Sequence, residues 1–162
     1  MTKSIRQIKQ MVKICLSDIK MYSSSAEALI LGTGAVESKY KYFKQLGGSE
    51  IARSYWQIEP TTCVDNIVNY LGFRQSKLKL VADSNMINPE ALAQLNLEQA
   101  SDLLTFNVKF AIQMARIKYY RVPKRLPDAD DIEGLGKYWL KYYNAGGKGS
   151  MEKWMEAQEI LS

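Results

Sequence analysis

The 162-residue sequence contains no histidine. This absence excludes Ser-His-Asp and Cys-His nucleophilic chemistry, and it removes the usual zinc ligand. Only two cysteines occur, Cys15 and Cys63, too few for an all-cysteine zinc site or a disulfide framework. Both lie inside apolar helical patterns, so we expect two reduced, buried thiols and neither a metal nor a cofactor. Carboxylate, lysine and tyrosine side chains remain for acid–base chemistry.

Long apolar runs are absent as well. No stretch of about 18 apolar residues occurs, so the sequence predicts no transmembrane segment. The N-terminal stretch MTKSIRQIKQMVKICL is basic, but charges and glutamines interrupt its apolar residues. A signal peptide needs an uninterrupted apolar core, so we expect no export signal and synthesis in the cytoplasm.

The charge balance is mildly positive, with 22 Lys and Arg against 17 Asp and Glu and a net charge of +5. This excess suits an anionic partner such as nucleic acid, anionic lipid or a cell-wall polymer. It is also ordinary for a globular domain, so charge alone selects none of these partners.

Apolar residues recur at three- and four-residue steps along most of the chain, which predicts a mainly α protein with one domain over residues 1–162. Ser24 and Glu27 form the pattern of a capping box, Pro123 ends a long helix, and Asp128 and Ser150 are candidate caps. The predicted helices span residues 4–21, 24–37, 62–73, 77–85, 89–95, 97–121 and 129–143, followed by a terminal helix after Ser150.

The helix expected over residues 24–37 is apolar on nearly every side. Gly32 and Gly34 lie in its interior, where each glycine costs roughly 1 kcal/mol relative to alanine. Such glycines suggest close packing by another backbone. We therefore expect this helix to be the buried centre of the domain, with Glu37 at its C-terminal end.

The helical period breaks between residues 39 and 57. The Gly47-Gly48 pair and the short run Arg53–Ile58 predict a small β-hairpin that ends at Pro60. The expected fold class is thus mainly α with one small β element (α+β).

Glu37 has the features of a general acid. A glycosidase needs a carboxylic acid that stays protonated near neutral pH, and burial raises a carboxyl pKa. The partial negative charge at a helix C-terminus acts in the same direction. A helix can also simply end in glutamate, so this argument alone leaves both interpretations open.

Three segments in order around Glu37 resemble the goose-type lysozyme and soluble lytic transglycosylase superfamily. The first is Glu37-Ser38 at a helix end, and the second is the Gln57-Ile58-Glu59-Pro60 segment twenty residues later. The third is Tyr142-Tyr143-Asn144-Ala145-Gly146-Gly147, and Asn107–Ala115 lies where the family has a long helix. The resemblance covers roughly residues 25–147, and within this superfamily the chain is most similar to small phage-encoded lysozyme-like proteins. It implies a lysozyme-like α+β fold in which the hairpin flanks the active-site cleft.

The resemblance implies a role for each matching residue. Glu37 would be the general acid, and Ser38 would lie in the cleft near the substrate. Gln57 would line the site beside the scissile sugar. Tyr143 would hydrogen-bond the catalytic carboxyl, with Asn144 beside it as a further substrate-binding residue.

The segment before Gln57 departs from the family pattern. Ser54-Tyr55-Trp56 replaces Gly-Leu-Met, so we expect Tyr55 to contribute to a bulkier substrate-binding floor. Each residue also has a simpler interpretation: the aromatic side chains can be core residues, and Gln57 can be an amide at a strand end. Asn144 and the glycines after it also fit an ordinary helix C-terminus.

A second carboxylate is needed by a hydrolase that activates water or forms a covalent intermediate. Glu59 and Glu50 flank the expected hairpin, and Asp65 follows closely. Glu59 is the favoured candidate, because strand alternation would place it on the same face as Gln57. Transglycosylases of this superfamily use a single acid that later acts as base, so the sequence leaves both mechanisms open.

Three functions follow from these patterns. The leading hypothesis is a muramidase or lytic transglycosylase that cleaves the β-1,4 MurNAc–GlcNAc bond of peptidoglycan glycan strands as a phage-derived monomer. It would reach the cell wall from the host cytoplasm by holin-type release, or act within the virion beside other virion proteins. The alternative is a non-catalytic virion structural or binding protein with a lysozyme-like fold. A nucleic-acid binder, suggested by the mixed basic and aromatic residues 118–125, is the least favoured.

Overall fold

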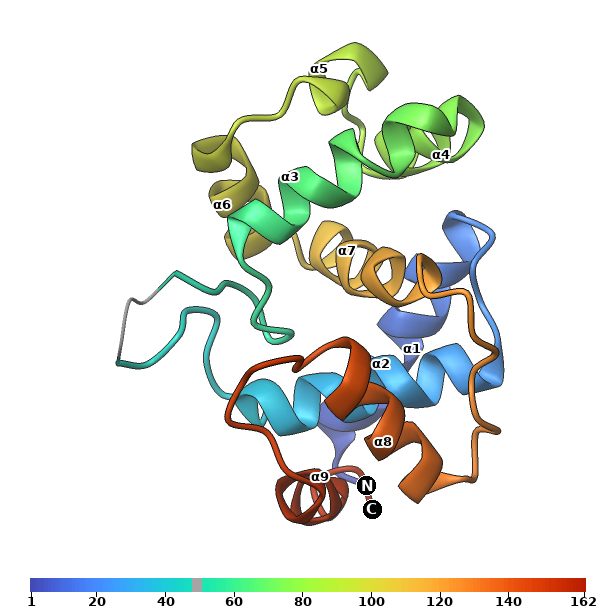
Figure 1. Cartoon of the computed structure of the whole chain (residues 1–162), viewed down its shortest axis with the longest axis vertical. Coiled ribbons are helices and arrows are strands. Elements are labelled where there is room, and N and C mark those ends of the chain that lie inside the picture. Colours follow the sequence, from blue (N-terminus) through green and yellow to red (C-terminus); the bar gives the residue numbers. More distant parts are fainter. Residues whose placement is uncertain (48–50) are drawn as a thin grey trace.

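The computed structural model describes residues 1–47 and 51–162. Within these residues the chain is all-α, with nine α-helices and one short 3-10 helix (Figure 1). The elements are α1 (Lys3–Asp18), α2 (Ser24–Ser38), α3 (Pro60–Val68), η1 (Leu71–Phe73), α4 (Gln75–Ser84), α5 (Pro89–Ala93), α6 (Leu97–Phe106), α7 (Val108–Tyr120), α8 (Ile132–Tyr142) and α9 (Met151–Gln158). The prediction of a mainly α fold is confirmed.

Helix α2 lies at the centre of one half of the molecule. It packs against α1, α7, α8 and α9, and most of its side chains are buried. Helices α3 to α6 form the other half, and α7 contacts both halves (Figure 1). Because neighbours cover α2 on nearly every side, its sequence is apolar around the whole helix rather than along one stripe.

The glycines inside α2 make room for aromatic side chains. A Cβ at Gly32 would lie 2.8 Å from Cζ2 of Trp154, and a Cβ at Gly34 would lie 2.5 Å from the Tyr40 hydroxyl. The expectation that another backbone packs at these positions is wrong, because the flat rings of Trp154 and Tyr40 occupy the space instead.

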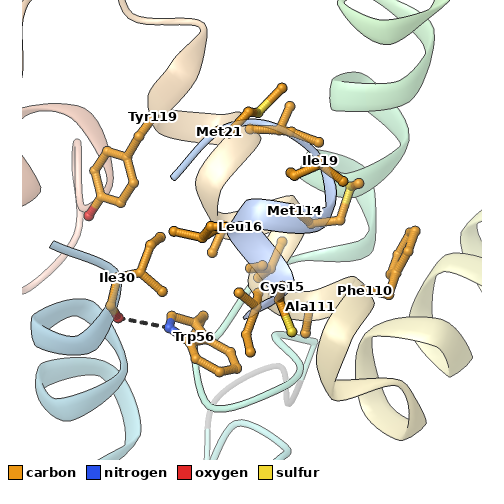
Figure 2. Close-up of a cluster of buried hydrophobic side chains, with 14 of the residues drawn as sticks. Cys15, Leu16, Ile19, Met21, Ile30, Trp56, Phe110, Ala111, Met114 and Tyr119 are labelled. Carbon is orange, nitrogen blue, oxygen red and sulfur yellow. Dashed lines mark hydrogen bonds between the residues drawn. The ribbon is translucent and has the colours of Figure 1, made fainter. Parts of the chain in front are cut away.

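Trp56 joins the segment before α3 to the centre of the core (Figure 2). Its indole is fully buried, and Nε1 donates a hydrogen bond of 2.9 Å to the Ile30 carbonyl. One turn further along α2, the Tyr119 hydroxyl and Thr33 Oγ1 lie 2.7 Å apart in a buried hydrogen bond. These polar contacts, placed among apolar side chains, satisfy groups that would be costly to bury unpaired.

The predicted β-hairpin is absent from the described residues. Arg53 and Ile58 exchange backbone hydrogen bonds of 2.9 and 2.8 Å around a tight turn, and Lys44 pairs with Arg53 as an isolated bridge. Ser54 and Gln57 have left-handed φ angles of 67° and 47°, so the chain curves where the prediction required it to stay extended.

Part of the expected hairpin lies outside the described residues. Gly48, in the expected turn, and Glu50, one of the flanking carboxylates, are among residues 48–50. The rest of the segment between α2 and α3 runs beside the C-terminal end of α2 (Figure 1).

The long helix predicted over residues 97–121 is two helices. Asn107 has an extended conformation between α6 and α7, and its Oδ1 accepts a hydrogen bond of 2.9 Å from Phe110 N. An asparagine side chain that caps the next helix competes with continuation of the first, so the chain turns at this residue.

The predicted caps are partly confirmed. Ser150 caps α9 as expected, through a hydrogen bond from Lys153 N. The cap of α2 is Ser23 rather than Ser24, and the cap of α8 is Asp131 rather than Asp128. These shifts of one to three residues move the helix starts without changing which face of each helix is buried.

Both cysteines are buried free thiols, as the sequence predicted. Burial raises the pKa of Cys15 to about 11 and that of Cys63 to about 12. Over the residues that the structure describes, none of the helices has the length and apolar character needed to cross a membrane.

Candidate active site

Glu37 lies in the last turn of α2, and its side chain is half-buried. Its Oε1 accepts a hydrogen bond of 2.9 Å from Trp139 Nε1 and a longer one of 3.5 Å from Asn144 Nδ2. The Tyr42 hydroxyl donates to the Glu37 backbone carbonyl at 3.0 Å, which ties the following segment to this helix end. Glu37 is thus held by α8, by the loop after α8 and by the segment after α2.

Opposing influences set the pKa of the Glu37 carboxyl group. Burial raises this pKa above its ordinary value, and it outweighs the hydrogen bonds from Trp139 and Asn144 and the positive charge of Lys118, which lower it. The net direction is upward. The carboxyl group therefore keeps its proton to a higher pH than an exposed glutamate does.

A cleft with a volume of about 720 Å³ opens beside Glu37. Its walls come from the end of α2, the segment between α2 and α3, the start of α3, α7, the loop after α8 and the start of α9. The lining is mostly polar. It includes Glu37, Tyr42, Gln45, Leu46, Ala52, Gln57, Glu59, Thr62, Lys118, Tyr143, Asn144, Ala145, Gly147, Lys148 and Lys153.

Lys118 is one of the cations that line the cleft. Its Nζ lies over the Tyr143 ring, 3.9 Å from the centroid, and donates a hydrogen bond of 2.8 Å to the Tyr143 carbonyl. Burial lowers the pKa of Lys118, while the negative charges of Glu37 and Glu59 raise it. One ammonium group therefore interacts with both carboxylates that line this cleft.

Gln57 and Glu59 both line the cleft with Glu37. The strand alternation expected to place them on one face is absent, because Gln57 has a left-handed φ and Glu59 is the residue before α3. The Gln57 amide nitrogen donates to the Ser54 carbonyl at 2.7 Å, which closes the turn before α3. Glu59 is exposed and lies at the N-terminal end of α3, where Thr61 Oγ1 is 3.4 Å from its carboxylate.

Tyr143 lies beside Glu37, but its hydroxyl group has a different hydrogen-bond partner from the predicted one. It is buried and lines the cleft, and its hydroxyl donates a hydrogen bond of 2.7 Å to the Trp56 carbonyl. The expectation that this hydroxyl would bond the Glu37 carboxyl is wrong. The carboxyl receives its hydrogen bonds from Trp139 and Asn144 instead.

Ser38 and Tyr55 lie away from the cleft, contrary to the predicted substrate contacts. Ser38 is fully buried, and its hydroxyl donates to the Gly34 carbonyl at 3.1 Å and accepts from Tyr40 N. Tyr55 packs against Tyr40 and stacks on Phe43 with ring centroids 4.4 Å apart. Ser38 closes the end of α2, and Tyr55 supports the segment that follows it.

The loop after α8 is shaped around Asn144. The Asn144 side chain accepts a hydrogen bond of 2.9 Å from Gly149 N while its amide nitrogen faces Glu37. A Cβ at Gly149 would lie 2.6 Å from Asn144 Oδ1, and one at Gly147 would also collide with that oxygen. Both glycines therefore let the loop close tightly around the asparagine.

Trp139 and Lys118 are the site residues that sequence reasoning missed. Trp139 precedes Tyr143 by four residues, so the helical period could have placed both on one face of the last predicted internal helix. Lys118 was grouped with its neighbours in a basic and aromatic run. Within that run the structure separates the residues: Lys118 lines the cleft, Tyr119 is in the core, and Arg121 pairs with Asp65.

Among the described residues, no cluster of three or more carboxylate, thiol or imidazole groups is placed to hold a metal ion. Comparison of the chain with protein-family models, curated proteins and solved structures found no match. The lysozyme-superfamily resemblance therefore stays a prediction from the three segments.

Proposed function

We propose that this chain is a peptidoglycan-cleaving glycosidase, a muramidase or lytic transglycosylase with a lysozyme-like arrangement around Glu37. The single observation that carries the proposal is the half-buried Glu37 carboxyl, with its raised pKa, on the wall of a polar cleft. The cleft's volume of about 720 Å³ suits a chain of sugar rings. Glycan strands of the cell wall are the proposed substrate.

In the first chemical step, protonated Glu37 gives its proton to the glycosidic oxygen as the bond to the anomeric carbon breaks. The leaving sugar departs with a new hydroxyl group, and Glu37 becomes a carboxylate. Trp139 and Asn144 donate hydrogen bonds to that carboxylate, and Lys118 faces it with a positive charge. These groups stabilise the negative charge that the transfer creates.

Two second steps are compatible with this cleft. Glu59 could activate a water or shield the cationic sugar, since it lines the same cleft and interacts with Lys118. Alternatively, the Glu37 carboxylate takes a proton from a hydroxyl of the muramyl sugar, whose oxygen then bonds to the anomeric carbon. The first route gives a reducing end and the second an anhydro-muramyl end, so product mass separates them.

Substitution of the acid tests the proposal. We expect Glu37→Gln to reduce clearing of purified cell walls by about 10²- to 10⁴-fold, the usual contribution of a general acid. Glutamine keeps an oxygen that accepts the Trp139 hydrogen bond, so the fold should be retained. The matched control is Glu90→Gln on α5, which does not line the cleft and should leave clearing unchanged. Full activity of Glu37→Gln would refute the proposal.

The second candidate function is a non-catalytic wall-binding or structural protein of a virion. The wide polar cleft and the exposed position of Glu59 favour it, since binding needs no second carboxylate. Wild-type chain that binds walls in a pull-down but clears none of several wall types would support this candidate. In either case we propose that the monomer reaches the wall through holin-type release or as part of the virion.

A further inference from the structure

Arg116 on α7 is a buried cation that lacks a carboxylate partner among residues 1–47 and 51–162. It is 7% exposed, and its Nε donates a hydrogen bond of 3.0 Å to the Met21 carbonyl. Within the same described residues, its two Nη atoms have no acceptor. A buried charge normally has such partners, because burial removes the water that would otherwise stabilise it.

The Nη atoms of Arg116 are accessible from solvent. In the described part of the chain, Asn85 Oδ1 is the one fully enclosed side-chain polar atom that lacks a hydrogen-bond partner. The Nη atoms also lack a partner, so they are not fully enclosed, and the small exposed part of the residue includes them. An acceptor in solution can therefore approach these N–H groups.

Tyrosine rings, rather than carboxylates, lie around the guanidinium group. Arg116 Cζ is 4.9 Å from the centroid of the Tyr120 ring, and Lys77 Nζ is 5.0 Å from the same centroid. Tyr70 and Tyr138 are also close enough to raise the pKa of Arg116, yet burial still lowers this pKa overall. A ring face attracts a cation but is only a weak hydrogen-bond acceptor, so the Nη donors stay available to a ligand.

The Tyr70 ring has further cations beside it. Arg74 Cζ lies 4.0 Å and Arg121 Cζ 5.8 Å from the centroid of this ring. Asp65 pairs with Arg121, whereas Arg74 and Lys77 form no ion pair with any residue that the structure describes. These unpaired cations and the two rings that they contact are called the Arg116 patch: Arg74, Lys77, Arg116, Tyr70 and Tyr120.

The Arg116 patch is separate from the Glu37 cleft. None of the five residues of the patch is among those that line the cleft. Lys118, two residues after Arg116, does line the cleft, because two steps along a helix turn the side chain by about 200°. The patch therefore presents its positive charge to a ligand other than one bound beside Glu37.

We propose that the Arg116 patch binds a phosphate group, held by the Nη groups of Arg116 and attracted by Lys77 and Arg74. The planar guanidinium fork matches two phosphate oxygens at once. A phosphomonoester carries about two negative charges near pH 7, which suits several cations better than the single charge of a carboxylate. The phosphate belongs either to a free small molecule or to a lipid headgroup. Neither source requires Glu37 to be catalytic, so the inference goes beyond the proposed function.

Isothermal titration calorimetry of the full chain with inorganic phosphate, at about pH 7.5 and with acetate at equal ionic strength as the reference, tests the site. We expect phosphate to bind at least about tenfold more tightly than acetate, because it offers oxygens to several donors at once. Arg116→Lys keeps the charge but removes the fork, so it should weaken phosphate binding about tenfold. Lys77→Gln, at a half-buried position, should weaken it about threefold.

Lys79→Gln is the matched control for Lys77→Gln. It removes one charge from the same helix, α4, at an exposed position where the lysine pairs with Asp83 rather than with a tyrosine ring. It should change phosphate binding by less than about twofold. If circular dichroism shows that Arg116→Lys is unfolded, the double variant Arg74→Gln/Lys77→Gln replaces it, with the same expected loss.

Vesicles of phosphatidic acid in phosphatidylcholine distinguish the two sources of the phosphate. Vesicle binding that inorganic phosphate displaces would assign the Arg116 patch to a lipid headgroup, and phosphate binding without vesicle binding would assign it to a free phosphate compound. Absent phosphate binding, equal binding of phosphate and acetate, or equal losses with Lys77→Gln and Lys79→Gln would overturn the inference. Salt-sensitive binding of a DNA oligonucleotide without phosphate binding would also overturn it, in favour of a nucleic-acid surface.

Discussion

At the scale of single residues, burial and hydrogen bonding act in opposite directions on the pKa of the Glu37 carboxyl group. Burial favours the protonated acid, which is the form that can donate to a leaving group. The donors Trp139 and Asn144 favour the carboxylate, which is the form left after donation. A general acid needs both properties, because a proton held too tightly is not transferred.

Trp139→Phe removes the shorter of the two hydrogen bonds to Glu37. The carboxylate then loses a donor while the site stays buried, so we expect the pKa of Glu37 to rise further. The alkaline limb of the pH–activity profile should move to higher pH. Carbon-13 NMR of the Glu37 carboxyl measures the same pKa without any assay of activity.

Trp154→Phe is the control for this substitution. Trp154 stacks on Trp139 with ring centroids 5.6 Å apart and is equally buried, but its Nε1 donates to the Ile132 carbonyl. Both variants should lose about 1–3 kcal/mol of stability through the smaller ring. Only Trp139→Phe should move the pKa of Glu37, and an equal shift in both variants would contradict the assigned hydrogen bond.

The residues of the site differed in how far sequence could locate them. Glu37 and Gln57 could be selected because each belongs to a local pattern with a stated spacing. The partner of the Tyr143 hydroxyl could not, because it is a backbone carbonyl 87 residues away. Sequence patterns identify chemical groups, whereas a hydrogen bond depends on where the packed elements bring those groups.

At the scale of elements, α2 shows why a helix can need glycine. Alanine is the better helix former by about 1 kcal/mol, so an exposed Gly→Ala change inside a helix is normally stabilising. At Gly32 the added methyl group would collide with the buried Trp154 ring. Whether Gly32→Ala stabilises or destabilises the protein therefore depends on α9, from which the Trp154 ring comes.

We expect Gly32→Ala to lower the free energy of unfolding by about 1–3 kcal/mol, since overpacking outweighs the propensity gain. Urea denaturation monitored by circular dichroism measures the change. Ser24→Ala, at the exposed start of the same helix, should stay within about 0.5 kcal/mol of wild type. A more stable Gly32→Ala protein would show that the α2–α9 contact is loose.

The segments where element prediction was wrong have a common cause. The alternating apolar run before Pro60 has strand-like composition, yet the buried Trp56 indole and the left-handed Ser54 and Gln57 make it a turn. Likewise, the helical pattern through residues 97–121 continues across Asn107. The Asn107 side chain nevertheless caps α7 by accepting a hydrogen bond from Phe110 N, and this cap divides the pattern into two helices. Apolar periodicity predicts which residues are buried. It predicts the direction of the chain only where the backbone keeps one regular secondary structure.

At the scale of the whole molecule, the raised pKa of Glu37 couples folding to pH. Between its ordinary value of 4.5 and its raised value in the folded chain, the folded state binds more protons than the unfolded state. The free energy of unfolding therefore falls as pH rises through this window. Asp65 affects the pH dependence of stability in a separate, lower pH range, because hydrogen bonds from Asn69 and Arg121 lower its pKa below 3.8.

Urea unfolding of wild type and Glu37→Gln, from about pH 4 to about pH 8, tests this coupling. Wild type should lose stability relative to Glu37→Gln as pH increases, because glutamine does not ionise. Above the window the difference between the two proteins should be constant. A difference that does not vary with pH would mean that the Glu37 carboxyl titrates normally.

The sequence by itself determined the mainly α architecture, the buried second helix and the carboxylate at its end. These features depend on local periodicity, on composition and on the absence of histidine, all of which can be read without distances. Only the tertiary structure decided that Trp139, 102 residues from Glu37, donates to its carboxyl, and that Lys118 faces the same cleft. The physical reason is that helix packing, rather than chain order, sets which polar groups share a buried site.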